Sequence, residues 1–253
     1  MVDLTALEVK AKEILAQMEE GKPVEADRAV ILGDLDLSSI DLPPGPEGRR
    51  AVSSKLKVTS CEVRGLVNMA DTAFLSPVSF KGTILPEADF WDCSFIAGAD
   101  FWEAKFSGDA NFWGATFVYN ANFTEAVFSG DADFISSRFR GNADLWSTSF
   151  SGRAVFSDAV FEGPANFWRA SFTKGADFRR ADFGSDANFS EAAFGDDADF
   201  IMARFCEDAS FLRASFLGSA DFRRAEFCGS ATFDDARFED KLNVARARFP
   251  RFK

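Results

Sequence analysis

The chain has 253 residues, and its 40 acidic and 28 basic side chains give a formal net charge of -12. This acidity disfavours direct nucleic-acid binding, and the lack of histidine in the sequence removes the commonest general base and metal ligand. No run of roughly eighteen apolar residues suggests a membrane span, and no basic-then-apolar leader begins the chain, so we expect a soluble, cytoplasmic protein without membrane contact.

Residues 3–20 are predicted to form one amphipathic helix. Thr5 and Glu8 fit a capping box at its start, and Gly21 before Pro23 supplies a stop. The apolar side chains recur at helical spacing on one face, namely Leu4, Leu7, Ala11, Ile14, Leu15 and Met18. The segment therefore has one face that must pack against the rest of the chain.

Residues 31–42 alternate between apolar and polar side chains, with Leu37 and Leu42 five positions apart, and are predicted to be extended. The run Pro-Pro-Gly-Pro-Glu-Gly-Arg-Arg over residues 43–50 then predicts an exposed loop. Its length fits either a functional loop or a tolerated insertion.

One eleven-residue phrase of the form ADFxxAxFxGD repeats from residue 88 to residue 249. Thirty large apolar positions are separated by five or six residues in alternation, and 28 of them are Phe, with Leu145 and Val244 the exceptions. The residue two positions earlier is small, and it is Ala at 26 of the thirty positions. A fixed period over such a length indicates a solenoid.

Each Phe is predicted to lie in a very short strand. Small, polar and Phe positions alternate inward and outward, whereas neither five nor six residues return to the same face of a helix. Such short strands must stack on their sequence neighbours, and sides of five and six residues match only if their number per turn is even. Four sides give a turn of 22 residues whose interior Phe and Ala fill. Gly-plus-polar pairs such as Gly108-Asp109 are expected at corners with positive φ.

The tandem run Ala-Asp-Phe-x-x-Ala-x-Phe resembles the pentapeptide-repeat family from about residue 55 to the end of the sequence. The resemblance implies a right-handed, four-sided parallel β-helix. The sixth residue on alternate sides departs from the five-residue unit of that family, which is expected to change corners rather than the core. Counting from Val58 to Phe249 gives 36 sides, or nine turns of four. The predicted fold is therefore an all-β solenoid of about nine turns with an N-terminal capping α-helix.

Three parts are predicted along the chain: a capping helix in residues 1–24, an opening strand with a Pro/Gly loop in residues 25–54, and the β-helix in residues 55–253. An open solenoid end exposes unpaired strand edges, so we expect the helix to cover the N-terminal end. A helix that serves a separate partner is the alternative. No helix is predicted after Phe249, so we expect a homodimer through the C-terminal end. The resemblance points the same way, since gyrase-binding members of the family dimerise through this end.

Outward residues 22 positions apart should stack into columns, and two such columns contain tryptophan. Trp91 and Trp113 follow their central Phe on one side of the coil, and Trp102, Trp146 and Trp168 do so on the opposite side. Exposed Trp is favoured at interfaces, so these residues form a candidate partner surface. The alternative is that each ring shields the strands beneath it.

A third column contains Asp177, Asp199 and Asp221, and these carboxylates join the candidate partner surface. Neighbouring Arg residues favour a salt-bridged surface over a divalent-cation site, which needs more converging oxygens, so no metal or cofactor is expected. Cys206 and Cys228 also lie 22 positions apart and are predicted to remain free thiols. Neither has the flanking ligands of a zinc site.

The sequence favours a non-enzymatic protein-interaction scaffold over an enzyme. It has a single Tyr and no phosphate-binding Gly loop, and no catalytic residue is assigned. The resemblance implies an alternative, because some pentapeptide-repeat proteins imitate duplex DNA and modulate a type II topoisomerase such as gyrase. The Arg residues within the acidic columns and the five Trp argue against that alternative.

Overall fold

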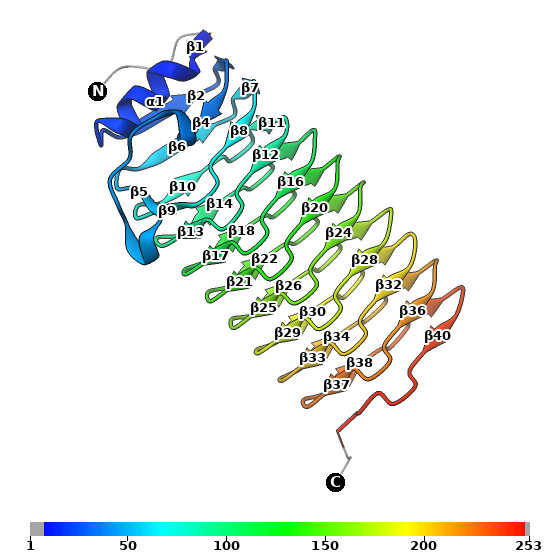
Figure 1. The fold of residues 1–253 in the computed structure, drawn as a ribbon. Coiled ribbons are helices and arrows are strands. Elements are labelled where there is room, and N and C mark those ends of the chain that lie inside the picture. The colour runs from blue at the N-terminus through cyan, green and yellow to red at the C-terminus, as the bar shows by residue number, and fades with distance from the viewer. Residues whose placement is uncertain (1–7, 251–253) are drawn as a thin grey trace.

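The chain winds into a four-sided coil. The computed structural model describes residues 8–250, and the turns follow one another from the helix at the N-terminal end to the C-terminal end (Figure 1). All strand pairings within the coil are parallel, and every fourth strand lies in the same sheet. Each of the four sheets is named here after the strand of the first complete turn that it contains.

Two opposite sides of the coil are the β2 sheet and the β4 sheet. The β2 sheet contains β2 (Val24–Asp27), β6 (Leu56–Thr59), β10 (Val78–Ser79), β14 (Ala99–Asp100), β18 (Ala121–Asn122), β22 (Ala143–Asp144), β26 (Ala165–Asn166), β30 (Ala187–Asn188), β34 (Ala209–Ser210) and β38 (Ala231–Thr232). The β4 sheet contains β4 (Leu35–Asp36), β8 (Val67–Asn68), β12 (Ala88–Asp89), β16 (Ala110–Asn111), β20 (Ala132–Asp133), β24 (Ala154–Val155), β28 (Ala176–Asp177), β32 (Ala198–Asp199), β36 (Ala220–Asp221) and β40 (Leu242–Asn243).

The other two sides are the β3 sheet and the β5 sheet. The β3 sheet contains β1 (Glu8–Lys10), β3 (Val30–Leu32), β7 (Glu62–Arg64), β11 (Ile84–Leu85), β15 (Lys105–Phe106), β19 (Val127–Phe128), β23 (Ser149–Phe150), β27 (Ser171–Phe172), β31 (Ala193–Phe194), β35 (Ser215–Phe216) and β39 (Arg237–Phe238). The β5 sheet contains β5 (Arg50–Val52), β9 (Thr72–Phe74), β13 (Ser94–Phe95), β17 (Thr116–Phe117), β21 (Arg138–Phe139), β25 (Val160–Phe161), β29 (Asp182–Phe183), β33 (Arg204–Phe205) and β37 (Glu226–Phe227).

Phe and Ala fill the interior, as the repeat predicts. Ala99 pairs with Ala121 across a step of 22 residues, and Phe101 stacks directly on Phe123 with ring centroids 4.9 Å apart and planes 6° apart. Phe101 also meets Phe112 of the facing sheet edge to face, with centroids 5.5 Å apart. Because stacked and edge-on pairs both suit the aromatic quadrupole, one ring type serves the column and the contact across the bore.

The coil is longer than nine turns. The register from Val58 to Phe249 does provide nine, but β1 to β5 belong to the same four sheets, so the β3 sheet has 11 strands and the coil about eleven turns. The coil therefore already runs through residues 24–52, upstream of position 55. Aliphatic residues such as Ile31 and Leu35 take the place of Phe there, and they are buried in the same core. A search for Phe spacing cannot detect such a turn.

The helix is shorter than predicted. It spans α1 (Ala11–Glu19), whereas Glu8 lies in β1, and the remaining part of the predicted 3–20 helix with its proposed Thr5 cap lies outside the described residues. Residues 8–10 alternate exposed, buried and exposed, and they pair with β3, so a partner distant in sequence makes the segment extended. Gly21 follows the helix with φ +67°, as a stop requires.

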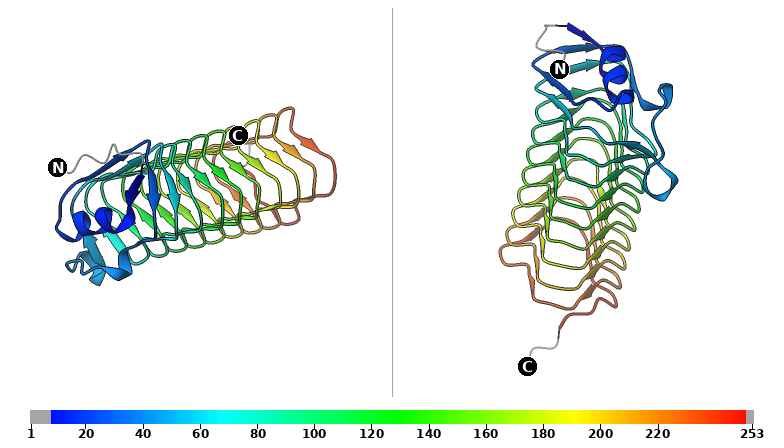
Figure 2. Two further views of the ribbon diagram at one scale, coloured as in Figure 1. Left: turned by 90° about the horizontal axis from the view of Figure 1, so that it is seen from above. Right: turned by 90° about the vertical axis from the view of Figure 1, so that its left-hand side faces the viewer.

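Helix α1 covers the N-terminal end of the coil (Figure 2). It packs against β1, β2 and β4, and it buries Ala11, Ile14, Leu15 and Met18 in the common core. Within the described residues, no helix has both the length and the apolar character needed to cross a bilayer.

The Pro/Gly loop projects where β4 would lead into β5, and two arginines hold its end against the coil. Nε and Nη2 of Arg49 donate to the backbone oxygen and a carboxylate oxygen of Asp92, both at 2.7 Å. Arg50 donates to the backbone oxygens of Leu37 and Ala70 at 2.6 and 2.8 Å. The base of the loop is therefore fixed, while its tip at Glu47 is exposed.

The corners differ from the prediction. Positive φ occurs two residues after the central side chain of the β2 and β4 sheets, on ordinary residues such as Glu103 (φ 54°), and the N–H of Ala104 donates to the oxygen of Phe101 to close a turn. Most glycines of the Gly-plus-polar corners, including Gly152, do not have positive φ. A Cβ on Gly152 would overlap the backbone oxygen of Gly130 one turn earlier. Glycine is thus needed there for close approach of two turns, not for φ.

Candidate interaction surface

The predicted partner residues divide between two opposite faces. Trp91 and Trp113 lie on the outer face of the β4 sheet, one residue after the central Phe90 and Phe112. The acidic column is on the same face, since β28, β32 and β36 carry Asp177, Asp199 and Asp221. Trp102, Trp146 and Trp168 lie on the β2 sheet instead. One compact partner domain that sits flat on one face therefore contacts only one of the two sets.

Trp91 and Trp113 offer free aromatic surface. Their exposed fractions are 45% and 49%, and within residues 8–250 no aromatic ring or cation stacks on either indole. The residue before each central Phe fixes the backbone, because the N–H of Trp91 donates to Oδ1 of Asp89 at 2.9 Å and that of Trp113 to Oδ1 of Asn111 at 3.0 Å. Two large side chains are thus held one turn apart on a rigid sheet.

Trp102, Trp146 and Trp168 are half-buried and already in contact with other side chains. Trp146 and Trp168 stack on each other with centroids 5.9 Å apart, and the guanidinium of Arg169 lies 4.7 Å from the Trp168 ring. Nζ of Lys81 lies 3.6 Å from the ring centre of Trp102. Nε1 of Trp102 and of Trp146 is buried without a hydrogen-bond partner. This column mainly shields the β2 sheet, which is the alternative considered from the sequence.

The polar residue before each central side chain forms a hydrogen-bonded ladder. On the β2 sheet the side-chain amide of Asn122 donates to Asp100 at 3.1 Å, and that of Asn166 donates to Asp144 at 3.1 Å. The next backbone N–H donates to the same side chains, as in the 3.1 Å bond from Thr124 to Asn122. Alternation of Asp and Asn lets each step of the ladder pair a donor with an acceptor.

The acidic column on the β4 sheet lacks this alternation and depends on arginine. Arg179 binds Asp177 through Nε and Nη2 at 2.6 to 3.0 Å, and Arg223 binds Asp221 at 2.8 Å. Asp199 has only a distant contact with Arg179 at 3.8 Å. Burial raises the pKa of Asp199, and the neighbouring carboxylates of Asp177 and Asp221 raise it further.

The surface has no metal-like arrangement in the part of the chain that the structure describes: no group of three or more Cys, Asp or Glu side chains converges there. The column is a flat row of carboxylates, and its two outer members are neutralised by the guanidinium groups of Arg179 and Arg223. A salt-bridged surface therefore describes this half of the face better than a cation site.

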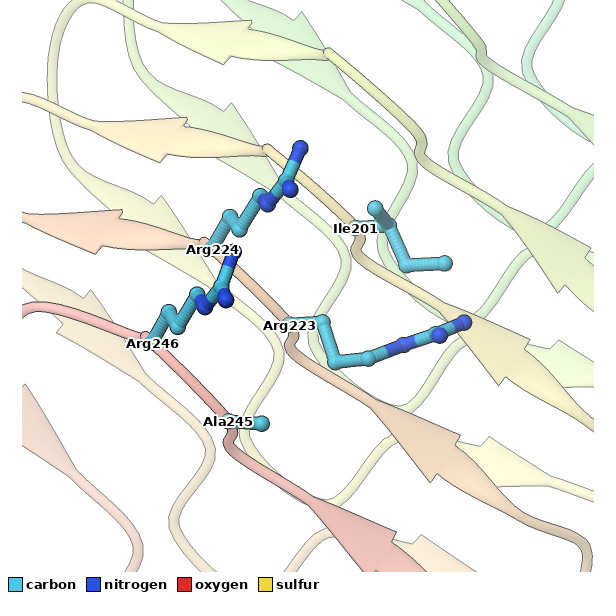
Figure 3. A pocket seen from close by; sticks show the side chains of 5 residues that line it. All are labelled: Ile201, Arg223, Arg224, Ala245 and Arg246. Atoms are coloured by element: carbon cyan, nitrogen blue, oxygen red, sulfur yellow. The ribbon is translucent and has the colours of Figure 1, made fainter.

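The C-terminal part of the same face carries a shallow basic hollow of about 410 Å³, lined by Ile201, Arg223, Arg224, Ala245 and Arg246 (Figure 3). Arg224 and Arg246 extend side by side, while Arg223 points away from them toward Asp221. Within residues 8–250, Arg224 and Arg246 make no ion pair. The sequence analysis did not single out this pair, although a spacing of 22 residues is the signal that would have found it.

The comparisons with known proteins agree with this architecture. A family model described as pentapeptide repeats (9 copies) matches residues 59–105 and, in overlapping segments, residues 112–225. Among solved structures, the chain is similar to HetL, a pentapeptide-repeat protein involved in heterocyst differentiation regulation from the cyanobacterium Nostoc sp. strain PCC 7120. The two are 16% identical over 90% of this chain and 94% of HetL, with a TM-score of 0.36. No curated protein matches the chain.

Proposed function

The chain belongs to the pentapeptide-repeat family, and from this premise we propose that it is a non-enzymatic scaffold that binds a protein partner through the outer face of the β4 sheet. The observation that carries the proposal is the pair of exposed, unstacked indoles of Trp91 and Trp113. Aromatic side chains of this kind supply much of the binding free energy of protein interfaces. The ladder beneath them keeps both rings in place before binding, so little conformational entropy is lost.

Charge along the same face supports a protein partner with mixed polarity. The indoles are followed toward the C-terminus by the salt-bridged acidic column, and then by Arg224 and Arg246. A partner that spans the face would meet an apolar, then an acidic, then a basic surface. Such an arrangement fixes the orientation of the partner and excludes partners with the reverse order of charges.

The test is capture of partners from an extract of the source cells by the immobilised full-length protein and its variants. Trp91→Ser with Trp113→Ser should abolish capture of the specific partner. Tyr119→Ser is the matched control, because Tyr119 is 64% exposed but lies away from the β4 sheet. Equal capture by all three proteins, each with wild-type circular dichroism, would disprove the role of this face.

A second function, modulation of a type II topoisomerase by DNA mimicry, is favoured by the net charge of -12 and the elongated coil. The pairing of Asp177 and Asp221 with arginines weakens any phosphate-like pattern on the β4 sheet. A supercoiling assay with purified gyrase separates the two functions. No effect at tens of micromolar protein would leave the scaffold alone.

We also propose that a second copy of the chain binds at the C-terminal end. Within residues 8–250, no element covers the last strands, and Leu242, Val244 and Phe249 are 43% to 46% exposed. Exposed strand edges with apolar neighbours favour edge-to-edge pairing, which a twofold dimer satisfies.

A further inference from the structure

Cys206 and Cys228 occupy equivalent positions one turn apart at the end of the β5 sheet. Each follows the central Phe of its strand, and those residues, Phe205 and Phe227, are Cα partners in the pairing of β33 with β37. Their rings stack with centroids 4.7 Å apart and planes 3° apart. The N–H of Cys228 donates to the oxygen of Phe205 at 2.8 Å, so the register continues through the two cysteines.

This register suits a disulfide. Neighbouring strands lie roughly 4.8 Å apart, which is within the range of about 4.4 to 6.8 Å that separates the Cα atoms of bonded cysteines. Both are free thiols in the structure, Cys228 exposed and Cys206 half-buried, whereas Cys61 and Cys93 are buried in the core. The chain thus contains one accessible pair of cysteines and one inaccessible pair.

The surroundings assign different chemical roles to the two sulfurs. Sγ of Cys206 donates to Oδ1 of Asp182 at 3.5 Å, and burial together with that carboxylate raises the pKa of Cys206. Arg204 lies between the turns, and the charges of ionised Cys206, of Asp182 and of ionised Cys228 raise the pKa of its guanidinium. The exposed Cys228, beside this cation, is the thiol that an external disulfide reaches first.

We propose that Cys206 and Cys228 form a reversible redox site that reacts with small disulfides such as glutathione disulfide. Cys228 loses its proton to solvent, and its thiolate attacks one sulfur of glutathione disulfide, which breaks that S–S bond and releases glutathione. Cys206 then loses its proton and attacks the Cys228 sulfur of the mixed disulfide, which releases the second glutathione. Two protein thiols are oxidised, and one glutathione disulfide is reduced to two glutathione molecules.

The bridge would join two consecutive turns near the uncovered C-terminal end. It closes a loop of 22 residues from Cys206 to Cys228 and so restricts separation of the last strands from the coil. Amide exchange in β37 and β39 should consequently slow by roughly tenfold or more on oxidation. Exchange in β14 and β18, far from the bridge, serves as the internal reference.

The test is oxidation of the full chain by glutathione disulfide, followed by tryptic mass mapping without reduction. Trypsin separates the cysteines into peptides 205–213 and 225–237, so a bridge links two peptides whose joint mass is about 2 Da below their sum. We expect this linked product without retained glutathione. Cys206→Ser should stop at one glutathione on Cys228, and Cys61→Ser with Cys93→Ser should behave as wild type.

Two results would overturn the proposal. The first is wild-type protein that retains glutathione on Cys228 without forming the bridge, and the second is a linkage found only between two chains. Arg204→Gln should slow the first step several-fold while leaving the final linked product unchanged. An unaltered rate in that variant would remove Arg204 from the mechanism.

Discussion

The residue before each central side chain determines whether a ladder is neutral or charged, and Asp199 is its weakest member. Its folded-state pKa is raised above the ordinary value of 3.8 by burial and by the neighbouring carboxylates. The folded state therefore binds the proton more tightly than the unfolded state, and this residue lowers stability as pH rises from 3.8 through the folded pKa. Asp199→Asn should raise stability at pH 7 by about 1 kcal/mol, because the amide can donate to Asp177.

Urea unfolding at several pH values checks this prediction. The gain from Asp199→Asn should shrink as pH falls toward 3.8. The reverse change, Asn122→Asp, is the matched control, because it replaces the donor to Asp100 by a second carboxylate and should destabilise at pH 7. A gain from Asp199→Asn that is constant across the pH range would contradict the electrostatic origin.

Gly152 tests whether glycine serves close approach at the corners. Since its φ is not positive, Ala would be tolerated by the backbone itself, but the Cβ would overlap the oxygen of Gly130. Gly152→Ala should therefore cost roughly 1–3 kcal/mol of unfolding free energy, as overpacking does. Gly108→Ala is the control at the equivalent corner, where the nearest atom to the Cβ is 3.2 Å away, and it should change stability by less than about 1 kcal/mol. Equal unfolding midpoints for the two variants would refute the argument.

Among the elements, helix α1 is the one whose removal would expose the interior. Ile14 is fully buried beneath it, so Ile14→Ala should cost about 2–5 kcal/mol and promote association of the uncovered ends. Lys12→Ala, on the exposed face of the same helix, should leave both properties unchanged. Thermal melting and light scattering provide the readouts. A wild-type melting temperature for Ile14→Ala would exclude a capping role.

The repeat made the elements predictable where it is regular, and only there. Five-and-six spacing of Phe101, Phe106 and Phe112 suffices for the four sides, and the 22-residue register follows because equal sides must stack. The start of α1 was wrong because residues 8–10 satisfy both a helical and a strand pattern. Pairing with β3, a contact distant in the sequence, decides between them.

Site residues were predictable as columns but not as surfaces. Sequence spacing places Trp102 and Trp113 equally well on their outward faces. Whether a ring is free depends on its neighbours in space: Lys81 covers Trp102, whereas no described side chain stacks on Trp113. Corner glycines were misread for a similar reason, since the distance between two turns is not visible in either turn alone.

At the scale of the whole molecule, the two ends of the coil differ. The N-terminal end is covered by α1, and its edge strand β1 is short and flanked by charged Glu8 and Lys10. The opposite end presents β38, β39 and β40 without a covering element in the described chain. Natural sheets protect such edges with charge or with a partner, so the asymmetry directs self-association to one end and limits it to a dimer.

Sedimentation velocity over a range of micromolar concentrations tests this dimer. Wild-type protein should shift from monomer to dimer as concentration rises, because pairing buries Val244 and Phe249 together with the free strand edges. Val244→Lys places a charge at the edge and should yield monomer at every concentration. Leu217→Lys, at a side chain that is 50% exposed but lies on a corner of the previous turn, should leave the dimer intact. Monomer alone for the wild type, or equal loss of dimer in both variants, would mean that the C-terminal end is not the interface.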